Sequence, residues 1–467
     1  MSKPFQTQFA ANTSNPRVSR RQALKTASAG FGYLALAGLL GQNAAKAATD
    51  ASEFHPLAPK APVFPAKAKR VIFLFMQGAM SQVDTIEYKA QLQKDDQKPA
   101  PGGGVLTASK FKFNQYGQTG TWISELFPNM ARHVDKFCFL RGLHTDVPAH
   151  PQAVIQLHTG TALASLVRPS MGSWLLYGLG TENQDLPGYI TINPPPQFGG
   201  ATNYGSAFLP AYYQGTRVSD TGYVPDLQAQ GPLGLQRRQI DLLQSMNRDF
   251  ANTPGATDQL DGVIQSYELA FKMQGKVPEL LDISKEPKDV LDAYGVKPGP
   301  AGSYARQCLM ARRLSEAGVR FVEICHPGWD QHNNLHQGLI RNCAETDQPT
   351  AALMADLDQR GLLDETLVIF GSEFGRLPSA QGPDGRDHNI TGYPMWLAGA
   401  GIKKGFSYGA TDEYGTKAVD GQMHTNDLHA TLLALMGLNH EKLTYRYAGR
   451  DFRLTNVAGN IVREIMA

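Results

Sequence analysis

The sequence predicts an α/β protein whose mostly parallel sheet is covered by helices on both faces. Two almost continuous apolar runs, Arg70–Gln77 and Thr366–Phe370, are typical of strands that are buried on both sides. Segments of helical length lie between the strand candidates, and this alternation favours a parallel sheet. Acids and histidines follow several of these strands, at the sheet edge where α/β proteins bind ligands.

The remaining elements follow from the same patterns. Shorter strands are expected at Phe137–Leu140, Tyr189–Asn193, Arg320–Ile324 and Pro394–Leu397. Helices are expected over Trp122–Val134, Pro151–Leu157, Gln236–Phe250, Asp258–Met273, Ser303–Ala317, Thr346–Arg360 and Asp427–Met436. Residues 194–287 form an expected insertion, because a Gly-, Pro- and Tyr-rich stretch without a period precedes more helical, polar segments.

The first 47 residues have the pattern of a twin-arginine signal peptide. Arg20 and Arg21 precede an apolar run from Ala27 to Leu40, and Ala45-Lys46-Ala47 offers a small-residue cleavage site. The apolar run is too short, and too rich in glycine, for a stable transmembrane span. An amphipathic N-terminal helix is the alternative interpretation. We therefore expect a periplasmic or extracellular protein that uses the twin-arginine export machinery.

The charge and composition of the rest of the chain narrow its function. Residues 48–69 are rich in Ala and Pro, as linkers are, so the folded domain is expected over 70–467. Six of the 44 Lys and Arg lie within residues 1–47, which leaves 38 basic against 42 acidic residues, a formal charge of −4. Bulk charge therefore gives no support for nucleic-acid binding. The four cysteines show no CxxC spacing, which argues against a thiolate zinc site.

The stretch from Thr366 to His388 carries the first candidate site. Glu373 and Arg376 come directly after the strand, and His388 follows in a loop that contains glycine and proline. A carboxylate at a strand end with an imidazole in the next loop is a common way to build a metal or acid–base site. A surface glutamate and an ordinary loop histidine are the open alternative.

Other predicted strands are followed by the same residue types. Asp330 and His332 follow Arg320–Ile324, and His150 lies beyond Phe137–Leu140. Nine of the twelve histidines lie in such loops or helix starts, and imidazole with carboxylate suits zinc, manganese or iron. Asp84, after the first strand, is either a ligand or a cap or turn residue.

Two further points stay open in the sequence. Asp427 opens a predicted helix, where we expect it to cap the helix rather than to bind metal. Ser81 and Thr145 are the hydroxyls available as nucleophiles after the first two strands, and neither has a diagnostic neighbourhood. A water molecule activated by a metal would need no such residue.

Several separated motifs closely resemble the bacterial sulfatase-like family called domain of unknown function 1501. They are GSEFGRLP with GRDH, GWDQH, RPSMGSWLLYGLG, YGSAFLPAYYQG and DLHATLLALMGL, and the resemblance extends from Val71 to about Thr455. It implies the fold of the alkaline phosphatase and sulfatase superfamily, whose members bind one or two divalent metals at the C-terminal edge of a parallel sheet.

The resemblance also bears on single residues. Glu373 would stand where the superfamily has an Asp-His pair, with Phe374 in place of the second ligand, and His388 resembles the late metal-binding histidine. Gln82 and Asn426 stand where family members carry histidine, and an amide is a poor metal ligand. The chain is therefore expected to bind metal less well than its relatives or to hold one ion rather than two.

We expect an exported metal-dependent hydrolase of sulfate or phosphate esters, whose substrate is an anionic ester or polysaccharide. The expected ligands of a divalent metal such as zinc, calcium or manganese are Asp330, His332, His388, Glu373 and Asp84. The expected catalytic residues are Glu373, His150 and Arg376, the last two facing the anionic substrate. The alternative is a non-catalytic envelope protein with a degenerate metal site, which binds a glycan or protein through the loops at Tyr204–Gln214.

Overall fold

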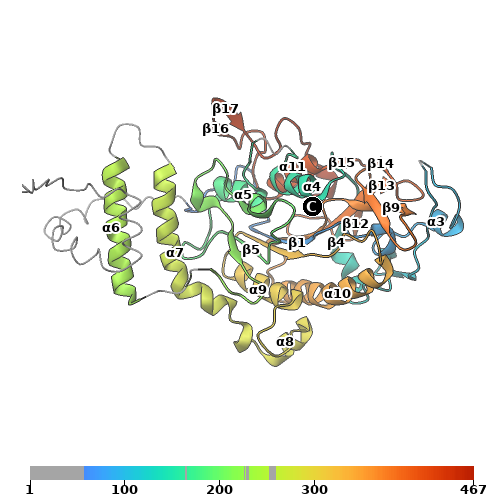
Figure 1. The fold of residues 1–467 in the computed structure, drawn as a ribbon, viewed down its shortest axis with the longest axis horizontal. Coiled ribbons are helices and arrows are strands. Elements are labelled where there is room, and N and C mark those ends of the chain that lie inside the picture. The colour runs from blue at the N-terminus through green and yellow to red at the C-terminus, as the bar shows by residue number, and fades with distance from the viewer. Residues whose placement is uncertain (1–56, 102, 163–165, 226, 228–230, 252–258) are drawn as a thin grey trace, which may run out of the picture. The chain divides into compact units, whose positions relative to one another are not determined.

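The computed structural model describes residues 57–467 except 102, 163–165, 226, 228–230 and 252–258 (Figure 1). The predicted signal peptide lies outside the described residues. Residues 57–69, expected to be linker, form no helix or strand but lie against the folded domain. The backbone N–H groups of Val63 and Phe64 donate to the carbonyl of Gly437, at 2.7 and 3.0 Å, and Leu57 is buried.

The centre of the described chain is a mixed sheet in which most strand pairs are parallel. Its order is β12 (Phe406–Tyr408), β4 (Phe137–His144), β11 (Tyr393–Gly399), β8 (Thr366–Gly371), β1 (Arg70–Met76), β7 (Phe321–His326), β5 (Tyr189–Ile192) and β6 (Thr216–Val218), with β15 (Met423–His424) beside β4. Within this sheet β11 runs antiparallel to both of its neighbours, β4 and β8. The predicted α/β fold with a mostly parallel sheet is confirmed.

Helices cover the two faces of this sheet (Figure 1). On one face lie α8 (Lys288–Tyr294), α9 (Tyr304–Glu316) and α10 (Leu335–Gln359); on the other lie α4 (His150–Thr159), α5 (Met171–Leu179) and α11 (Thr425–Leu435). Strand β1 is apolar from Val71 to Met76 because both of its faces are buried. Ile72 and Leu74 belong to the hydrophobic cluster beneath α9 and α10, whereas Val71 and Phe73 belong to the cluster beneath α4, α5 and α11.

One helix prediction is wrong and helix α5 (Met171–Leu179) was not predicted, each for an identifiable reason. The helix expected over Trp122–Val134 is wrong: β3 (Thr121–Ser124) pairs with β2 (Phe113–Tyr116), and a 3₁₀-helix, Met130–Lys136, follows. The β-favouring residues of β3 and the intervening Pro128 account for the break. Helix α5 was not expected because it is buried almost all round and shows little amphipathic period.

The predicted insertion, residues 194–287, contributes to the main sheet as well as carrying helices. Its strand β6 is the edge strand beside β5, and its long helices are α6 (Leu233–Ala251) and α7 (Gln259–Leu281). The small elements that complete the described chain are α3 (Ala90–Lys94), β9 (Gly375–Ala380), β10 (Arg386–Asn389), β13 (Ala410–Thr411), β14 (Ala418–Asp420), β16 (Tyr445–Tyr447) and β17 (Arg450–Phe452). In the described part of the chain, no helix has the length and apolarity that a membrane span requires.

Helix α11 confirms the capping role expected for Asp427. The Asp427 carboxylate accepts a hydrogen bond of 2.8 Å from the backbone N–H of His424, and the His424 ring accepts one of 3.1 Å from Asn426 N–H. This reciprocal pair is a capping box, which satisfies donors that the helix itself leaves unpaired. Asp427 is therefore occupied in fixing the start of the helix.

Farther along α11, His429 predicts a weakening of the fold in acid. Burial, with smaller effects of His424 and His158, lowers the pKa of His429 to about 4, against about 6.5 in an unfolded chain. Because the unfolded chain binds the proton first, stability is complete above pH 6.5 and falls by up to about 3 kcal/mol as the pH drops towards 4.

A single variant isolates this effect. The ring of His429 donates through Nε2 to the Leu157 carbonyl at 2.7 Å, and the amide of His429→Gln can replace that donor without titrating. Denaturant unfolding at pH 7, 5.5 and 4.5 is expected to show a shallower loss of stability in His429→Gln than in wild type. Equal slopes in the two proteins would contradict the assignment.

Candidate metal centre

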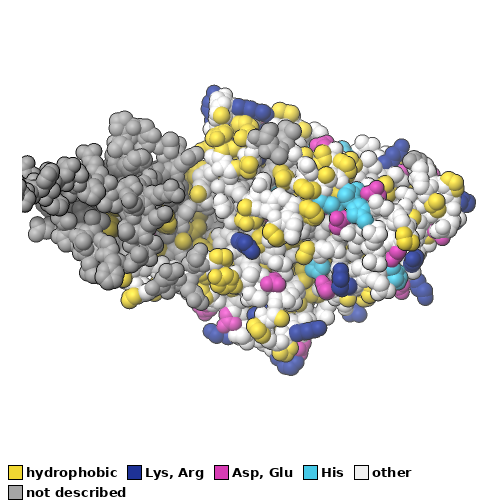
Figure 2. Space-filling model, viewed as in Figure 1, with side chains coloured by type: hydrophobic (Ala, Val, Ile, Leu, Met, Phe, Trp, Pro, Cys, Tyr) yellow, Lys and Arg dark blue, Asp and Glu magenta, His cyan; other side chains and the backbone are white. Residues whose placement is uncertain are grey.

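Four side chains meet at the C-terminal edge of the sheet. Asp330 and His332 lie in the loop after β7, His150 is the first residue of α4 after β4, and His388 lies on β10 beyond β8. One ligand atom of each lies within 4.8 Å of the others. Figure 2 shows histidine side chains gathered beside acidic ones on the visible face. The structure thus brings together residues that follow three different strands.

The four side chains are arranged around one carboxylate oxygen. Asp330 Oδ1 lies 3.0 Å from His150 Nε2, 2.9 Å from His332 Nε2 and 3.7 Å from His388 Nε2. The Nε2 atoms of His332 and His388 are themselves only 2.8 Å apart. The Asp330 side chain is 37% exposed, so the centre is open to solvent on one side.

The opposite nitrogen of each histidine ring is held by the protein. His150 Nδ1 lies 2.6 Å from Glu373 Oε1, His332 Nδ1 contacts Gln381 Oε1, and His388 Nδ1 contacts the Pro148 carbonyl. Since these partners are acceptors, each Nδ1 carries the proton, and each Nε2 presents a lone pair to the common centre. Holding the outer nitrogen in this way is how proteins orient histidine ligands of metals.

This arrangement fits a divalent cation. His150 Nε2 is buried without a hydrogen-bond partner, and the lone pairs of His332 and His388 repel each other unless a positive charge lies between them. Ligands of one zinc ion at about 2.1 Å lie at most about 4.2 Å apart. Every Nε2–Oδ1 distance to Asp330 meets that limit. Three imidazoles and one carboxylate suit zinc or manganese better than calcium, which prefers oxygen ligands.

Glu373 lies behind His150 rather than at the centre. Its side chain is fully buried, and both carboxylate oxygens accept hydrogen bonds from the backbone N–H of Gly78, at 3.0 and 3.2 Å. A Cβ at Gly78, whose φ is +109°, would lie 2.5 Å from Asp330 N, so only glycine allows this approach. Glu373 therefore fixes the ring of His150 and joins the β1 and β8 loops.

Arg376, on β9, is a structural anchor of the centre. Its side chain is fully buried, and its guanidinium lies 2.7 Å from Asp330 Oδ1. The remaining donors bond the backbone carbonyls of Gly78, Ala79, Trp329 and Arg386, and Nη1 also lies 3.4 Å from His332 Nε2. With its donors used in this way, Arg376 orients Asp330, and the contact with an anionic substrate that we expected from the sequence stays a prediction.

These contacts set the charge of the centre. Burial alone would raise the pKa of Asp330, but its contacts with His150, His388 and Arg376 outweigh burial and hold that pKa well below its usual range. Burial by itself would lower the pKa of His150. The neighbouring carboxylates of Asp330 and Glu373 outweigh burial, so the pKa of His150 is raised. Asp330 is thus a carboxylate at any physiological pH, as a metal ligand must be.

Residues 68–466 match the profile of a family described as protein of unknown function, DUF1501. The match covers most of the sequence. The chain belongs to the DUF1501 family. A search of curated protein sequences found no match.

Several solved structures are similar to this DUF1501 chain at low identity. The lipoteichoic acid synthase LtaP from Listeria monocytogenes is 9% identical, with 85% of this chain and 78% of that chain covered and a TM-score of 0.38. The PsFucS1 sulfatase from Pseudoalteromonas sp. is 14% identical, with 91% and 73% covered and a TM-score of 0.34. An alkaline phosphatase from the Antarctic bacterium TAB5 is 13% identical, with 81% and 100% covered and a TM-score of 0.34.

Asp84 lies outside the group of four in this DUF1501 chain. It forms a buried ion pair with Arg386, whose Nε and Nη2 lie 2.7 and 3.2 Å from its two oxygens. The hydroxyl of Ser81 donates to the same carboxylate at 2.6 Å, and that of Thr145 donates to Gln156 at 2.9 Å. Asp84 thus closes the β1 loop against β10, and both candidate nucleophiles point to other protein groups.

From the sequence we expected His150 to contact the substrate, and we did not foresee the supporting role of Gln381. The stretch Arg386-Asp387-His388 was expected to be a loop, yet it forms strand β10, which pairs with β9 so that His388 lies opposite Arg376. Gln381, which holds His332, lies just beyond β9 in the same hairpin. The position of His150 could have been inferred from the sequence, because a His-Pro pair opens the helix after β4.

The supporting role of Glu373 predicts the effect of a conservative change. Glu373→Gln keeps the side-chain shape but can present its amide N–H₂ to His150 Nδ1 and to Gly78 N–H, which weakens the orientation of the ring. Metal affinity, measured by competition with a chelating dye, is expected to fall about 10- to 100-fold. The matched control Glu365→Gln changes a surface carboxylate far from the centre and should leave the affinity unchanged. Equal affinities for all three proteins would contradict this role.

Proposed function

We propose that this DUF1501 protein is an exported, metal-dependent hydrolase of sulfate or phosphate esters. The observation that carries the proposal is the convergence of three Nε2 atoms on Asp330 Oδ1, with every Nδ1 held by an acceptor. His150, His332, His388 and Asp330 would hold one divalent ion, of which zinc and manganese suit the donors best. Such an ion, when bound, supplies Lewis acidity towards the oxygens of an anionic ester.

The protein's own residues divide the work around that ion. Glu373 orients the ring of His150, and Arg376 fixes the carboxylate of Asp330, so both act by positioning. The exposed side of Asp330 and His332 leaves room for the ester to approach from solvent. One water molecule is consumed, and the alcohol and inorganic sulfate or phosphate leave. Ser81 and Thr145 are turned to other partners, which favours direct attack by water over a covalent intermediate.

The fate of the N-terminal segment is part of the same proposal. Export by the twin-arginine route would carry the folded chain, with its ion already bound, to the periplasm or the cell exterior. Fusion of residues 1–47 to a reporter that is active only after export tests this step. Export that fails when Arg20 and Arg21 are both replaced by Lys would support it, and export that continues unchanged would contradict it.

A panel of aryl and sugar sulfates and phosphates tests the chemistry. The purified protein is expected to contain bound metal by elemental analysis and to hydrolyse at least one class of ester, and a chelator should abolish that hydrolysis. His388→Ala should lose both metal and activity, whereas His133→Ala, which changes a histidine outside the group, should keep both. A protein that contains no metal and turns over no ester would overturn the proposal.

The alternative of a non-catalytic binding protein has one observation in its favour. Arg376, the expected cationic contact for an anionic substrate, is consumed by protein acceptors. Against it, Phe208 and Tyr213 of the Tyr- and Gly-rich loops are buried, so this stretch packs inward more than it presents a surface. Ester hydrolysis that is abolished in His388→Ala would exclude this alternative.

A further inference from the structure

A pocket of about 490 Å³ lies next to the candidate metal centre. It is lined by the start of α10, three residues after His332, and by the β9–β10 hairpin, two residues before His388. The two sites also touch through the backbone, because a Cβ at Gly385, in the pocket lining, would lie 1.8 Å from the carbonyl of His332. The pocket lining is therefore in direct contact with the loop that carries His332.

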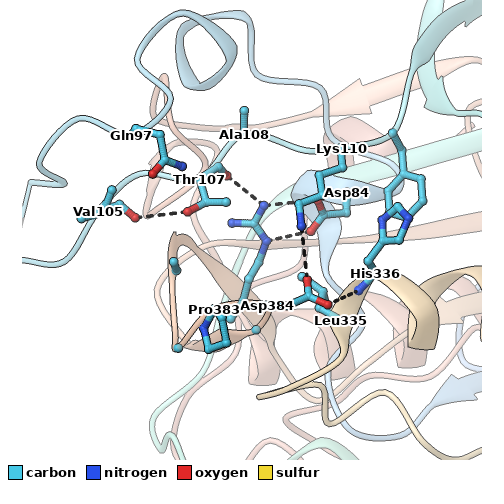
Figure 3. A pocket seen from close by; sticks show the side chains of 15 residues that line it. Asp84, Gln97, Val105, Thr107, Ala108, Lys110, Leu335, His336, Pro383 and Asp384 are labelled. Carbon is cyan, nitrogen blue, oxygen red and sulfur yellow. Dashed lines mark hydrogen bonds and ion pairs between the residues drawn. The ribbon is translucent and has the colours of Figure 1, made fainter.

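One wall of the pocket is closed by groups that satisfy each other (Figure 3). Arg386 is buried and pairs with both oxygens of Asp84. Its guanidinium also donates to the carbonyls of Thr107 and Leu377, at 2.9 and 3.3 Å. Since its donors are used and a carboxylate lies beside it, Arg386 is not a receptor for a free anion.

Two other residues of the lining, Lys110 and Asp384, offer groups that a ligand can use. Lys110 has a side chain that is 59% exposed, and its Nζ lies 3.8 Å from Asp384 Oδ1, too far for a hydrogen bond. The ammonium and the carboxylate thus stand side by side, and the second carboxylate oxygen, Oδ2, accepts a hydrogen bond of 3.4 Å from the backbone N–H of His336 (Figure 3). Beside them Phe111 stacks on His336, with ring centroids 4.7 Å apart and planes at 8°, which gives the pocket an aromatic wall.

We propose that this pocket binds a sugar ring of the substrate, next to the ring whose ester lies at the metal centre; the inference rests on the proposed function. Neighbouring hydroxyls of a sugar need a donor and an acceptor together, which Lys110 and Asp384 supply, and the apolar face of the ring suits an aromatic wall. Free sulfate or phosphate fits less well, because two carboxylates, Asp84 and Asp384, line the pocket. The volume is that of small-molecule sites.

Binding to the full exported chain tests the pocket independently of catalysis. The probes are sulfated hexasaccharides prepared from carrageenan, chondroitin sulfate and heparin, and the corresponding sulfated monosaccharides, titrated calorimetrically into metal-free and metal-loaded protein. Lys110→Met and Asp384→Asn are each expected to weaken binding of the preferred hexasaccharide about tenfold. Both variants should leave the binding and turnover of monosaccharide esters unchanged, because neither residue touches the metal ligands.

Matched controls separate this effect from a general change of charge. Lys112→Met removes a neighbouring lysine that does not line the pocket, and Asp364→Asn removes a carboxylate that is 80% exposed; both should bind like wild type. Thermal unfolding of all variants checks that they fold, and a misfolded variant is replaced by Lys110→Gln or Asp384→Ser.

The outcomes separate the two proposals. Hexasaccharide binding that the pocket variants weaken, without turnover of any ester by wild type, would sustain the pocket and overturn the hydrolase. Ester turnover with hexasaccharide affinities equal in wild type and both pocket variants would overturn the pocket alone. Absence of hexasaccharide binding to wild type would also overturn the pocket.

Discussion

Replacing Asp330 with Asn is expected to abolish stoichiometric metal binding and the ester hydrolysis that depends on it. Asp330 is the only carboxylate in the group of four, and its Oδ1 is the atom on which the three imidazoles converge. Loss of an orienting residue costs metal affinity about 10- to 100-fold, and loss of a ligand should cost more. Metal content by elemental analysis and the rise in thermal midpoint on adding zinc give two independent measures.

The variant is chosen so that folding does not confuse the result. Asn keeps the shape of Asp330 and an oxygen that can accept from Arg376, so the metal-free protein should unfold near the wild-type temperature. Asp364→Asn, at an exposed carboxylate, serves as the control and should bind metal normally. If Asp330→Asn bound zinc with wild-type affinity, the four-residue centre would be the wrong assignment.

Arg376→Met is expected to destabilise the whole domain, by at least about 3 kcal/mol. The change removes the donors on which four buried backbone carbonyls depend, and each unsatisfied acceptor costs about 1–3 kcal/mol. It also leaves Asp330 without its neighbouring positive charge. Denaturant unfolding at pH 7 measures the loss, and metal binding should fall in parallel because Asp330 is no longer held.

A surface arginine provides the comparison. Arg360 pairs with Asp356 and Glu316 and has a side chain that is 35% exposed, so Arg360→Met should cost no more than about 1 kcal/mol. If Arg376→Met instead unfolded like wild type but lost affinity for anionic esters, Arg376 would be a substrate contact, as the sequence suggested. The two measurements therefore decide between an anchoring and a recognition role.

The fold class could be predicted from the sequence because strands that are buried on two faces consist almost entirely of apolar residues. The apolar runs at Arg70–Gln77 and Thr366–Phe370 have no polar alternation, and both prove to be central strands with hydrophobic clusters on either side. Local chemistry predicted less where tertiary burial overrides it. Helix α5 is apolar almost all round, so its sequence shows no amphipathic period from which a helix could be predicted. The segment around Trp122 was expected to be a helix, yet it pairs as a strand.

The sequence by itself determined which residue types stand at the sheet edge, since strand ends can be located from pattern alone. Only the tertiary structure decided which of them share a centre. Glu373 contacts the backbone N–H of Gly78 and the ring of His150, and Asp84 pairs with Arg386. Asp330 alone of these three acids faces the three imidazoles. The direction of a side chain after a turn depends on partners far away in the chain, such as Arg376 and Gly78, and no local pattern encodes them.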